Sequence, residues 1–131
     1  MKLARPNAII SMLADDDLTG KAGHFVRMSS NTAIALIDNA LTPPLGLLLT
    51  EGKTNERVSV AISAGGLAGT VRVKLAGTVQ LGGALQLTAD GRVVSYDSEF
   101  PRMIVGVALE SGVIGELIEV ALQTPTYTPA S

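Results

Sequence analysis

His24 is the only imidazole in the chain, and the chain contains no cysteine. A catalytic histidine needs a nucleophile or a carboxylate partner, and a metal-binding histidine needs further ligands. Without thiols or a second imidazole, only carboxylates could complete a metal site. His24 stands between Gly23 and Phe25 at the start of an expected strand, and we interpret it as a packed structural residue. The lack of cysteine also excludes thiol nucleophiles, iron–sulfur clusters, zinc ribbons and disulfides.

The acidic run Asp15–Asp17 offers oxygen ligands of the kind that a hard cation prefers. Adjacent carboxylates without a loop of spaced ligands make a poor cage for such an ion. The run therefore favours a solvated turn, or the start of a helix or turn before Gly20. No metal site is expected here.

Glycine-rich stretches occur at 65–69, at 82–83 and at Gly91, and such stretches can cradle phosphates. The P-loop spacing is absent, and no helix is expected to follow residues 65–69 and supply a dipole for an anion. We interpret these glycines as hairpin and bulge residues.

Lys74 and three glutamates are the remaining candidates for chemistry. The strand around Lys74 resembles that of the lysine carrying the cofactor in lipoyl and biotinyl domains, but that lysine sits at a hairpin tip, whereas Lys74 lies among alternating aliphatics. Glu110, Glu116 and Glu119 could form an acid–base pair, yet their spacing near the last expected hairpin is that of surface carboxylates. No catalytic constellation is present, so the sequence predicts neither an enzyme nor a cofactor.

The composition narrows the function further. The chain has 131 residues, a net charge of −2 and 3% aromatic residues, so it lacks the basic surface and the stacking platforms of nucleic-acid-binding proteins. No apolar run is long enough for a transmembrane helix, and Pro6 interrupts any signal-peptide core. Hydrophobic residues make up 47% and charged residues only 17%. This balance indicates a chain that buries surface against other chains.

The elements that must position these residues are short β-strands. Apolar and small or polar residues alternate with the period of two that one-sided strands show. The alternating segments are 58–62, 71–75, 85–87, 105–109 and 118–122. A strand is also expected over 33–37 rather than a short helix over 32–41, because two prolines follow closely, and Asp90–Gly91 is an expected hairpin turn.

The sequence thus predicts an all-β fold, a small β-barrel or β-sandwich of short antiparallel strands. We expect an N-terminal arm at residues 1–19, a β-barrel domain at 20–123 and an extended C-terminal tail at 124–131. The tail has two prolines, so it is expected to lie outside any sheet interior.

A weak internal repeat is also present. Residues 23–62 align with 83–122 at an offset of 60 without a gap, with glycines and strand residues coinciding. Convergent strand–turn patterning explains this equally well. If the repeat is genuine, the domain has two similar four-strand halves joined by residues 64–82.

The second half carries a resemblance to a known family. The runs 77–85, 89–93, 104–111 and 115–120 read Gly-Thr-Val-Gln-Leu-Gly-Gly-Ala-Leu, Ala-Asp-Gly-Arg-Val, Ile-Val-Gly-Val-Ala-Leu-Glu-Ser and Gly-Glu-Leu-Ile-Glu-Val. Their order resembles that of the small capsid cement, or head decoration, proteins of tailed phages and prophages, over about a third of the chain. The first half departs from it, because Pro43–Pro44 stands where the second half has Met103–Ile104.

The resemblance implies a structural virion protein, made in the host cytoplasm, that binds the outer surface of the major capsid protein shell, often as a homotrimer. It brings no catalytic residues. An N-terminal arm could order on the shell by adding a strand to a neighbouring sheet edge. The candidate contact residues combine positive charge with apolar side chains. They are Lys2, Leu3, Arg5, Ile9, Ile10, Met12 and Leu13.

Two other functions remain open on the sequence alone. One is a small β-barrel carrier or ligand-binding module of a cellular complex, for which a cofactor linked to Lys74 would be the mark. The other is a hydrolase or lyase subunit with a site shared between chains, which would have to include His24.

Overall fold

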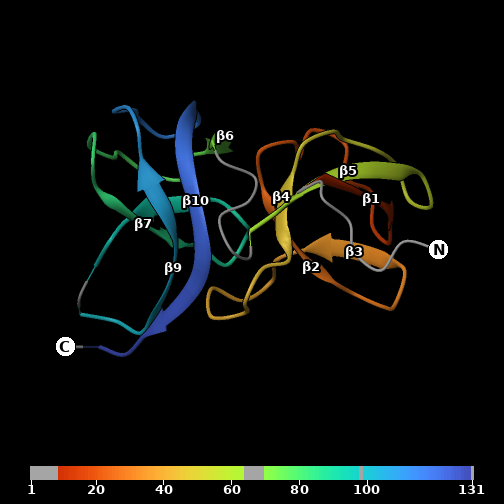
Figure 1. Ribbon diagram of the computed structural model, residues 1–131, viewed down its shortest axis with the longest axis horizontal. Coiled ribbons are helices and arrows are strands. Elements are labelled where there is room, and N and C mark those ends of the chain that lie inside the picture. The colour runs from red at the N-terminus through yellow and green to blue at the C-terminus, as the bar shows by residue number, and fades with distance from the viewer. Residues whose placement is uncertain (1–8, 64–69, 98, 131) are drawn as a thin grey trace.

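The computed structural model describes residues 9–63, 70–97 and 99–130, and these residues form ten β-strands and no helix (Figure 1). The expected all-β fold is confirmed. The first half holds β1 (Ile9–Ala14), β2 (Phe25–Met28), β3 (Ala33–Leu36), β4 (Gly46–Leu48) and β5 (Arg57–Ile62). The second half holds β6 (Thr70–Lys74), β7 (Ala84–Leu87), β8 (Val93–Ser95), β9 (Arg102–Ala108) and β10 (Leu117–Thr128). No helix among the described residues could cross a membrane.

The first half is a closed barrel with the strand order β1-β3-β2-β4-β5. β1 pairs with β3 in parallel, at Leu13↔Ala33 and Ala14↔Ile34, and with β5 in antiparallel fashion. The expectation of antiparallel strands is therefore corrected for this one pair. The barrel interior is filled by small aliphatic side chains, because alternate residues of each strand point inward. These are Ala14, Leu18, Val26, Ile34, Leu48, Val58 and Val60.

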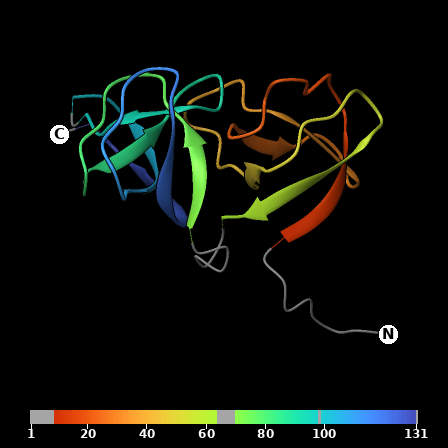
Figure 2. The ribbon, with the colours of Figure 1, turned by 90° about the horizontal axis from the view of Figure 1, so that it is seen from above.

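The second half is a five-stranded antiparallel sheet with the order β6-β10-β9-β7-β8. The chain just after β6 meets β8 at the isolated parallel bridge between Leu75 and Val93, where the Ala76 N–H donates to the Val93 carbonyl at 2.8 Å. We call the place where these two edges of the sheet meet the seam, and the first half lies against it. The N–H of Lys74 donates to the Gly23 carbonyl at 2.9 Å, and the N–H of Phe25 donates to the Gly91 carbonyl at 2.7 Å. The two halves stand side by side (Figures 1 and 2).

One hydrophobic core joins the two halves. It contains the inward-facing aliphatic residues of the second sheet together with Phe25, Ile37 and Leu47 of the first half. Phe25 and Leu47 are fully buried. Since these three side chains point out of the barrel and into the second core, the outer surface of one half completes the interior of the other.

The internal repeat is present in the structure, but its expected gapless register is wrong over β2 and β7. Val26↔Gly46 recurs as Leu85↔Gly106, so equivalent residues of β2 and β7 are 59 apart, whereas those of β4 and β9 are 60 apart. β1–β5 correspond in order to β6–β10, and the pairing of Leu48 with Val60 recurs as that of Ala108 with Val120. The positive φ of 69° at Asn55, before β5, recurs as 88° at Gly115, before β10. Each half therefore has five strands rather than four, and the segment expected to link the halves contains β6.

Bonds outside the strand ladders also recur between the halves. The N–H of Leu18 donates to the Gly52 carbonyl at 2.7 Å, and that of Val79 to the Gly112 carbonyl at 2.9 Å. Convergent strand patterning alone would not reproduce such loop bonds, so we interpret the halves as copies of one structural unit.

Two boundaries expected from the sequence are corrected. Residues 9–14, placed in an N-terminal arm, form β1 in the wall of the barrel, while residues 1–8 lie outside the described residues. The tail expected beyond residue 123 continues β10 as far as Thr128, which pairs with Arg102. Pro125 is tolerated because the pairing of β10 with β6 ends at Ala121 and the ladder with β9 skips to Thr126, so no bond is required of the proline.

Candidate functional site

His24 is a packed, neutral residue at the contact between the halves. Its side chain is buried, and burial together with the nearby charge of Lys21 lowers the pKa of the imidazole. Its backbone N–H donates to the Lys21 carbonyl, and its carbonyl accepts from Leu48. Nδ1 has no hydrogen-bond partner among the described residues. These contacts favour the structural interpretation of His24.

The acidic run before Gly20 builds a turn. The Oδ1 atom of Asp17 accepts hydrogen bonds from the Thr19 hydroxyl at 2.6 Å and from the Thr19 N–H at 3.1 Å. These bonds lower the pKa of the Asp17 carboxyl. Within the described ranges, no group of three or more histidine, aspartate or glutamate residues could hold a metal ion.

The glutamates near the last hairpin are used within the fold. Oε1 of Glu116 accepts a hydrogen bond from the Val113 N–H at 2.7 Å, as Oε1 of Glu56 does from the Lys53 N–H at 2.6 Å in the first half. These two carboxylates stabilise the same turn in the two copies. A structural role accounts for the pair without any acid–base chemistry.

The two other glutamates are also engaged. Oε1 of Glu110 accepts from the backbone N–H of Glu119 at 3.0 Å. The Glu119 carboxylate itself lies 3.6 Å from Nε of Arg72 in an exposed ion pair. Each carboxylate thus has a partner within the fold: a backbone N–H for Glu110 and Glu116, and the Arg72 guanidinium for Glu119.

Lys74 is the last residue of β6 and pairs with Leu117 rather than sitting at a hairpin tip. Its backbone N–H bonds the first half, as described above, so the position is structural. Gly82 and Gly91 adopt positive φ in turns, as the hairpin interpretation expects. The glycines at 65–69 lie outside the described residues.

The candidate contact residues of the N-terminus fall into two groups, three outside the described residues and four in β1. Lys2, Leu3 and Arg5 lie outside the described residues. The other four belong to β1, where Ile10 and Met12 pack against the barrel core, Leu13 is half-buried and Ile9 is 55% exposed. β1 pairs with β5 from Ile9 to Leu13 and with β3 at Leu13 and Ala14, so these four residues belong to the barrel wall and not to a free arm.

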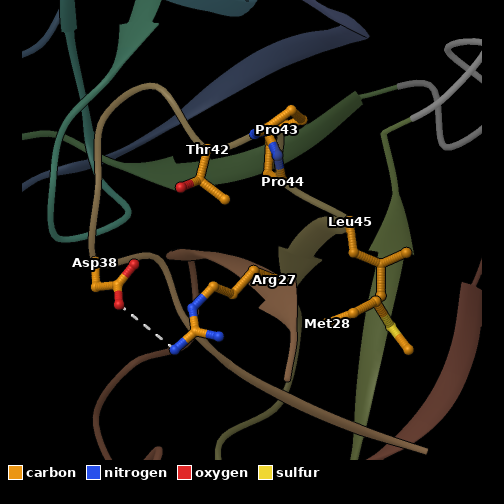
Figure 3. Close-up of a pocket in the computed structure, with 7 residues that line it drawn as sticks. All are labelled: Arg27, Met28, Asp38, Thr42, Pro43, Pro44 and Leu45. Carbon is orange, nitrogen blue, oxygen red and sulfur yellow. Dashed lines mark ion pairs between the residues drawn. The ribbon is translucent and has the colours of Figure 1, made fainter. Parts of the chain in front are cut away.

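A pocket of about 530 Å³ opens in the first half between β2 and the segment that leads into β4 (Figure 3). It is lined by Arg27, Met28, Asp38, Thr42, Pro43, Pro44 and Leu45. The Arg27 guanidinium lies 3.6 Å from the Asp38 carboxylate, and its Nε donates to the Leu36 carbonyl at 3.2 Å. The Arg27 guanidinium is therefore engaged within the fold, and the 71% exposure of the Asp38 side chain makes the ion pair a weak one.

The prolines explain why this pocket exists. In the second half, the pairing of β7 with β9 continues to Gln86↔Ile104, whereas β2 and β4 stop at Val26↔Gly46. Pro44 stands where the second half has Ile104, and proline has no N–H to donate. The chain therefore turns away from β2 and leaves the hollow. Sequence reasoning noted the prolines but not this consequence.

Exposed apolar side chains concentrate on the second half. Of the eleven large apolar side chains that are exposed among the described residues, eight belong to this half. They are Leu81, Tyr96, Phe100, Leu109, Val113, Ile114, Leu117 and Tyr127. Leu81 lies beside the β9–β10 turn, because its N–H donates to the Ser111 hydroxyl at 3.0 Å. The sequence did not identify this uneven distribution of exposed apolar side chains between the halves.

Comparison with known proteins adds one likeness. No protein-family model and no curated protein matches the chain. Among solved structures, it is similar to the crystal structure of the N base of head fiber gp8.5 in bacteriophage phi29. The TM-score is 0.66 at 15% sequence identity, and the match covers 88% of this chain and 93% of that one.

This likeness establishes a shared fold. The similar structure comes from a phage head, as the resemblance to capsid cement proteins implied, but it is a head fiber and not a cement protein. Because the match covers most of both chains, it includes both β-units and is not limited to one small barrel.

Proposed function

We propose that the chain is a structural protein of a phage virion, attached to the outer surface of the head through the major capsid protein. The observation that carries this proposal is the fold shared, over most of both chains, with the base of a phage head fiber. The motif order of residues 77–122 points to the same class of protein independently. In this proposal the chain binds and holds its partner and catalyses no reaction.

The use of the reactive side chains supports this interpretation. His24, Lys74 and the glutamates contribute to turns, ion pairs and the contact between the halves, as described above. In this proposal the chain recognises its partner through its surface. An apolar surface of low charge is suited to a stable contact between protein chains.

We also propose that the N-terminal segment contacts the shell. Lys2, Leu3 and Arg5 combine positive charge with an apolar side chain, and Ile9 continues them as an exposed residue at the start of β1. Because β1 is fixed in the barrel, the contact is confined to residues 2–9 rather than 2–14. The cement role and the trimeric state belong to the same proposal.

Co-sedimentation with undecorated capsids of the source phage tests the proposal. We expect the purified chain to pellet with the capsids in a fixed ratio to the capsid subunits and to remain in the supernatant without them. Deleting residues 2–8 is expected to weaken binding at least tenfold. Absence of any binding by the unaltered chain would refute the virion role.

A charge-matched pair of variants makes the test specific. Lys2→Glu with Arg5→Glu changes the net charge by the same amount as Lys53→Glu with Arg57→Glu, which alters exposed residues of the first half. Only the first variant should lose capsid binding. Equal effects of both would show a general charge effect and would contradict a role for the N-terminal segment.

A further inference from the structure

The pocket beside β2 contains an unfilled position in the sheet of the first half. The register of β4 with β2 ends at Val26↔Gly46, so β4 has no residue in register with Met28, the last residue of β2. Met28 lines the pocket and is 43% exposed. The edge of β2 that faces β4 is therefore open where the pocket begins.

The backbone groups of Met28 face this open edge. Neighbouring residues of an antiparallel strand direct their N–H and C=O groups to opposite sides. On the β3 side, the N–H of Ser29 donates to the Ala33 carbonyl at 3.0 Å. On the β4 side, the Val26 carbonyl accepts from the N–H of Leu45 at 2.9 Å. Met28 stands one residue before Ser29 and two residues after Val26, so its N–H and C=O point to the β4 side, toward the pocket.

The second half shows what fits such a position. The strand equivalent to β4 is β9, which has seven residues where β4 has three. In β9, Met103 is buried and Ile104 pairs with Gln86 of β7. In the first half, Pro43 and Pro44 stand at the positions of these two residues, and the chain turns away from β2. An extended strand with aliphatic or thioether side chains therefore matches the open position beside β2.

The lining of the pocket suits an apolar side chain on such a strand. Its apolar walls are formed by Met28, Pro43, Pro44 and Leu45. Figure 3 shows the two prolines across the hollow from Arg27. The volume of about 530 Å³ lies in the range of ligand pockets. The Arg27 guanidinium lies 3.6 Å from the Asp38 carboxylate, so these two opposite charges offset each other and the site does not require a charged partner group.

We propose that the pocket and the open edge of β2 together bind an extended segment of the major capsid protein. The segment pairs with the Met28 backbone and places an aliphatic side chain against Pro43 and Pro44. In strand addition of this kind, main-chain hydrogen bonds give affinity and pockets for alternate side chains give specificity. The identity of the partner rests on the proposed function, whereas the open position in the sheet defines what kind of segment is bound. The site uses no residue of the N-terminal segment and is a separate contact.

The variant Met28→Pro tests the backbone pairing. Proline removes the N–H that faces the pocket, and it is tolerated on edge strands where that N–H makes no ladder bond. We expect Met28→Pro to weaken binding at least tenfold in the co-sedimentation assay with undecorated capsids. The matched control Met28→Leu keeps the N–H and an apolar side chain of similar size, so it should bind as the unaltered chain does. Equal losses in both variants would assign the effect to the side chain and contradict the pairing.

A second variant closes the pocket with residues that the chain already uses. Pro43→Met with Pro44→Ile gives the first half the pair that stands at Met103 and Ile104, and it restores two N–H groups, so the segment can pair with β2 itself. We expect this double variant to protect the Met28 amide from hydrogen exchange, as the unaltered free chain does not. Its binding to capsids should also fall at least tenfold.

The outcomes separate the site from the virion role. Full capsid binding by Met28→Pro would overturn the site and leave the virion role standing, as would full binding by the double variant with its Met28 amide protected. Absence of binding by the unaltered chain would overturn both. If light scattering shows that the unaltered chain associates with itself and that Met28→Pro abolishes this, the occupant is a second copy and the assignment to the capsid protein is wrong.

Discussion

Gly46 and Gly106 occupy equivalent positions in the two halves, yet the structure predicts that alanine is far more costly at Gly46. A Cβ atom at Gly46 would lie 2.0 Å from the carbonyl oxygen of Ala61 and 2.8 Å from its carbonyl carbon. At Gly106 the nearest atoms, the carbonyl oxygen of Ala121 and Cγ1 of Val120, are each 2.7 Å away. Real Cβ atoms essentially never approach closer than 3.0 Å, so something must shift in both cases.

The magnitudes differ because the required shifts differ. Relief at Gly46 needs a shift of about 1 Å against backbone atoms of β5, and relief at Gly106 needs about 0.3 Å. Overpacking costs about 1–3 kcal/mol, and a shift of β4 would weaken ladder hydrogen bonds worth about 1 kcal/mol each. Alanine restricts the unfolded chain more than glycine does. This effect is equal in both variants and adds about 0.4–1 kcal/mol to the free energy of unfolding. From these terms, we expect Gly46→Ala to lose about 3–4 kcal/mol and Gly106→Ala to lose about 0–1 kcal/mol.

Urea unfolding followed by far-ultraviolet circular dichroism measures this difference, since the chain has no tryptophan for fluorescence. The slope of the unfolding free energy against urea should stay the same in both variants, so that the change in midpoint reports stability alone. Thermal unfolding should show the same order. Equal losses in the two variants, or a larger loss for Gly106→Ala, would refute the reasoning from strand contact.

Three further predictions concern single residues. Burial lowers the pKa of His24, so the unfolded chain binds more protons and stability should fall as the pH is lowered below about 6.5; in His24→Gln, denaturation followed over pH should show a smaller decline. Burial of Asp90 is outweighed by hydrogen bonds from Thr88 and Arg92 that lower its pKa to about 2. Asp90→Asn should therefore destabilise the protein at neutral pH, and titrated denaturation should show this difference disappearing as the pH falls from about 4 toward 2. Phe25→Ala removes a ring shared by both halves and should cost about 3–5 kcal/mol in urea unfolding; a loss below about 1 kcal/mol would contradict the shared core.

The strands that sequence patterning predicted well are those with one buried face. In β5, Val58 and Val60 are buried while Ser59 is not, and β10 repeats this at Ile118 and Val120. A period of two is visible in the sequence because neighbouring residues meet different surroundings. The turn at 90–91 was predictable for a comparable reason, since the positive φ of Gly91 favours glycine.

β1 was missed because its surroundings do not alternate so clearly. Three consecutive residues, Met12 to Ala14, are buried or half-buried, since the strand pairs with β5 along its length and with β3 at its end. The extension of β10 was missed for another reason. Pro125 argues against a central strand, but it lies beyond the pairing with β6, where fewer backbone bonds are required.

Whether an outward-facing side chain of the second half is exposed could not be predicted from the sequence alone, because burial there depends on which unit covers which. Leu47 and Val107 have the same strand position and the same chemical type, yet one is fully buried and the other is half-buried. Alternation predicts that a residue points outward but not whether another unit lies on that side. Only the arrangement of the two halves separates an internal contact from a surface that is free to bind.

The two halves also differ in how the sheet of each one closes. This difference explains why the two halves remain in contact. The first copy closes itself, because β1 and β3 pair in parallel at Leu13 and Ala14. In the second copy the equivalent strands share the bridge at Leu75, and the backbone at Gly23 and Phe25 bonds both sides of the seam. Phe25 then fills the second core, while its counterpart Ala84 is too small to fill another. The chain is therefore a directional pair of units, in which the first half completes the core of the second.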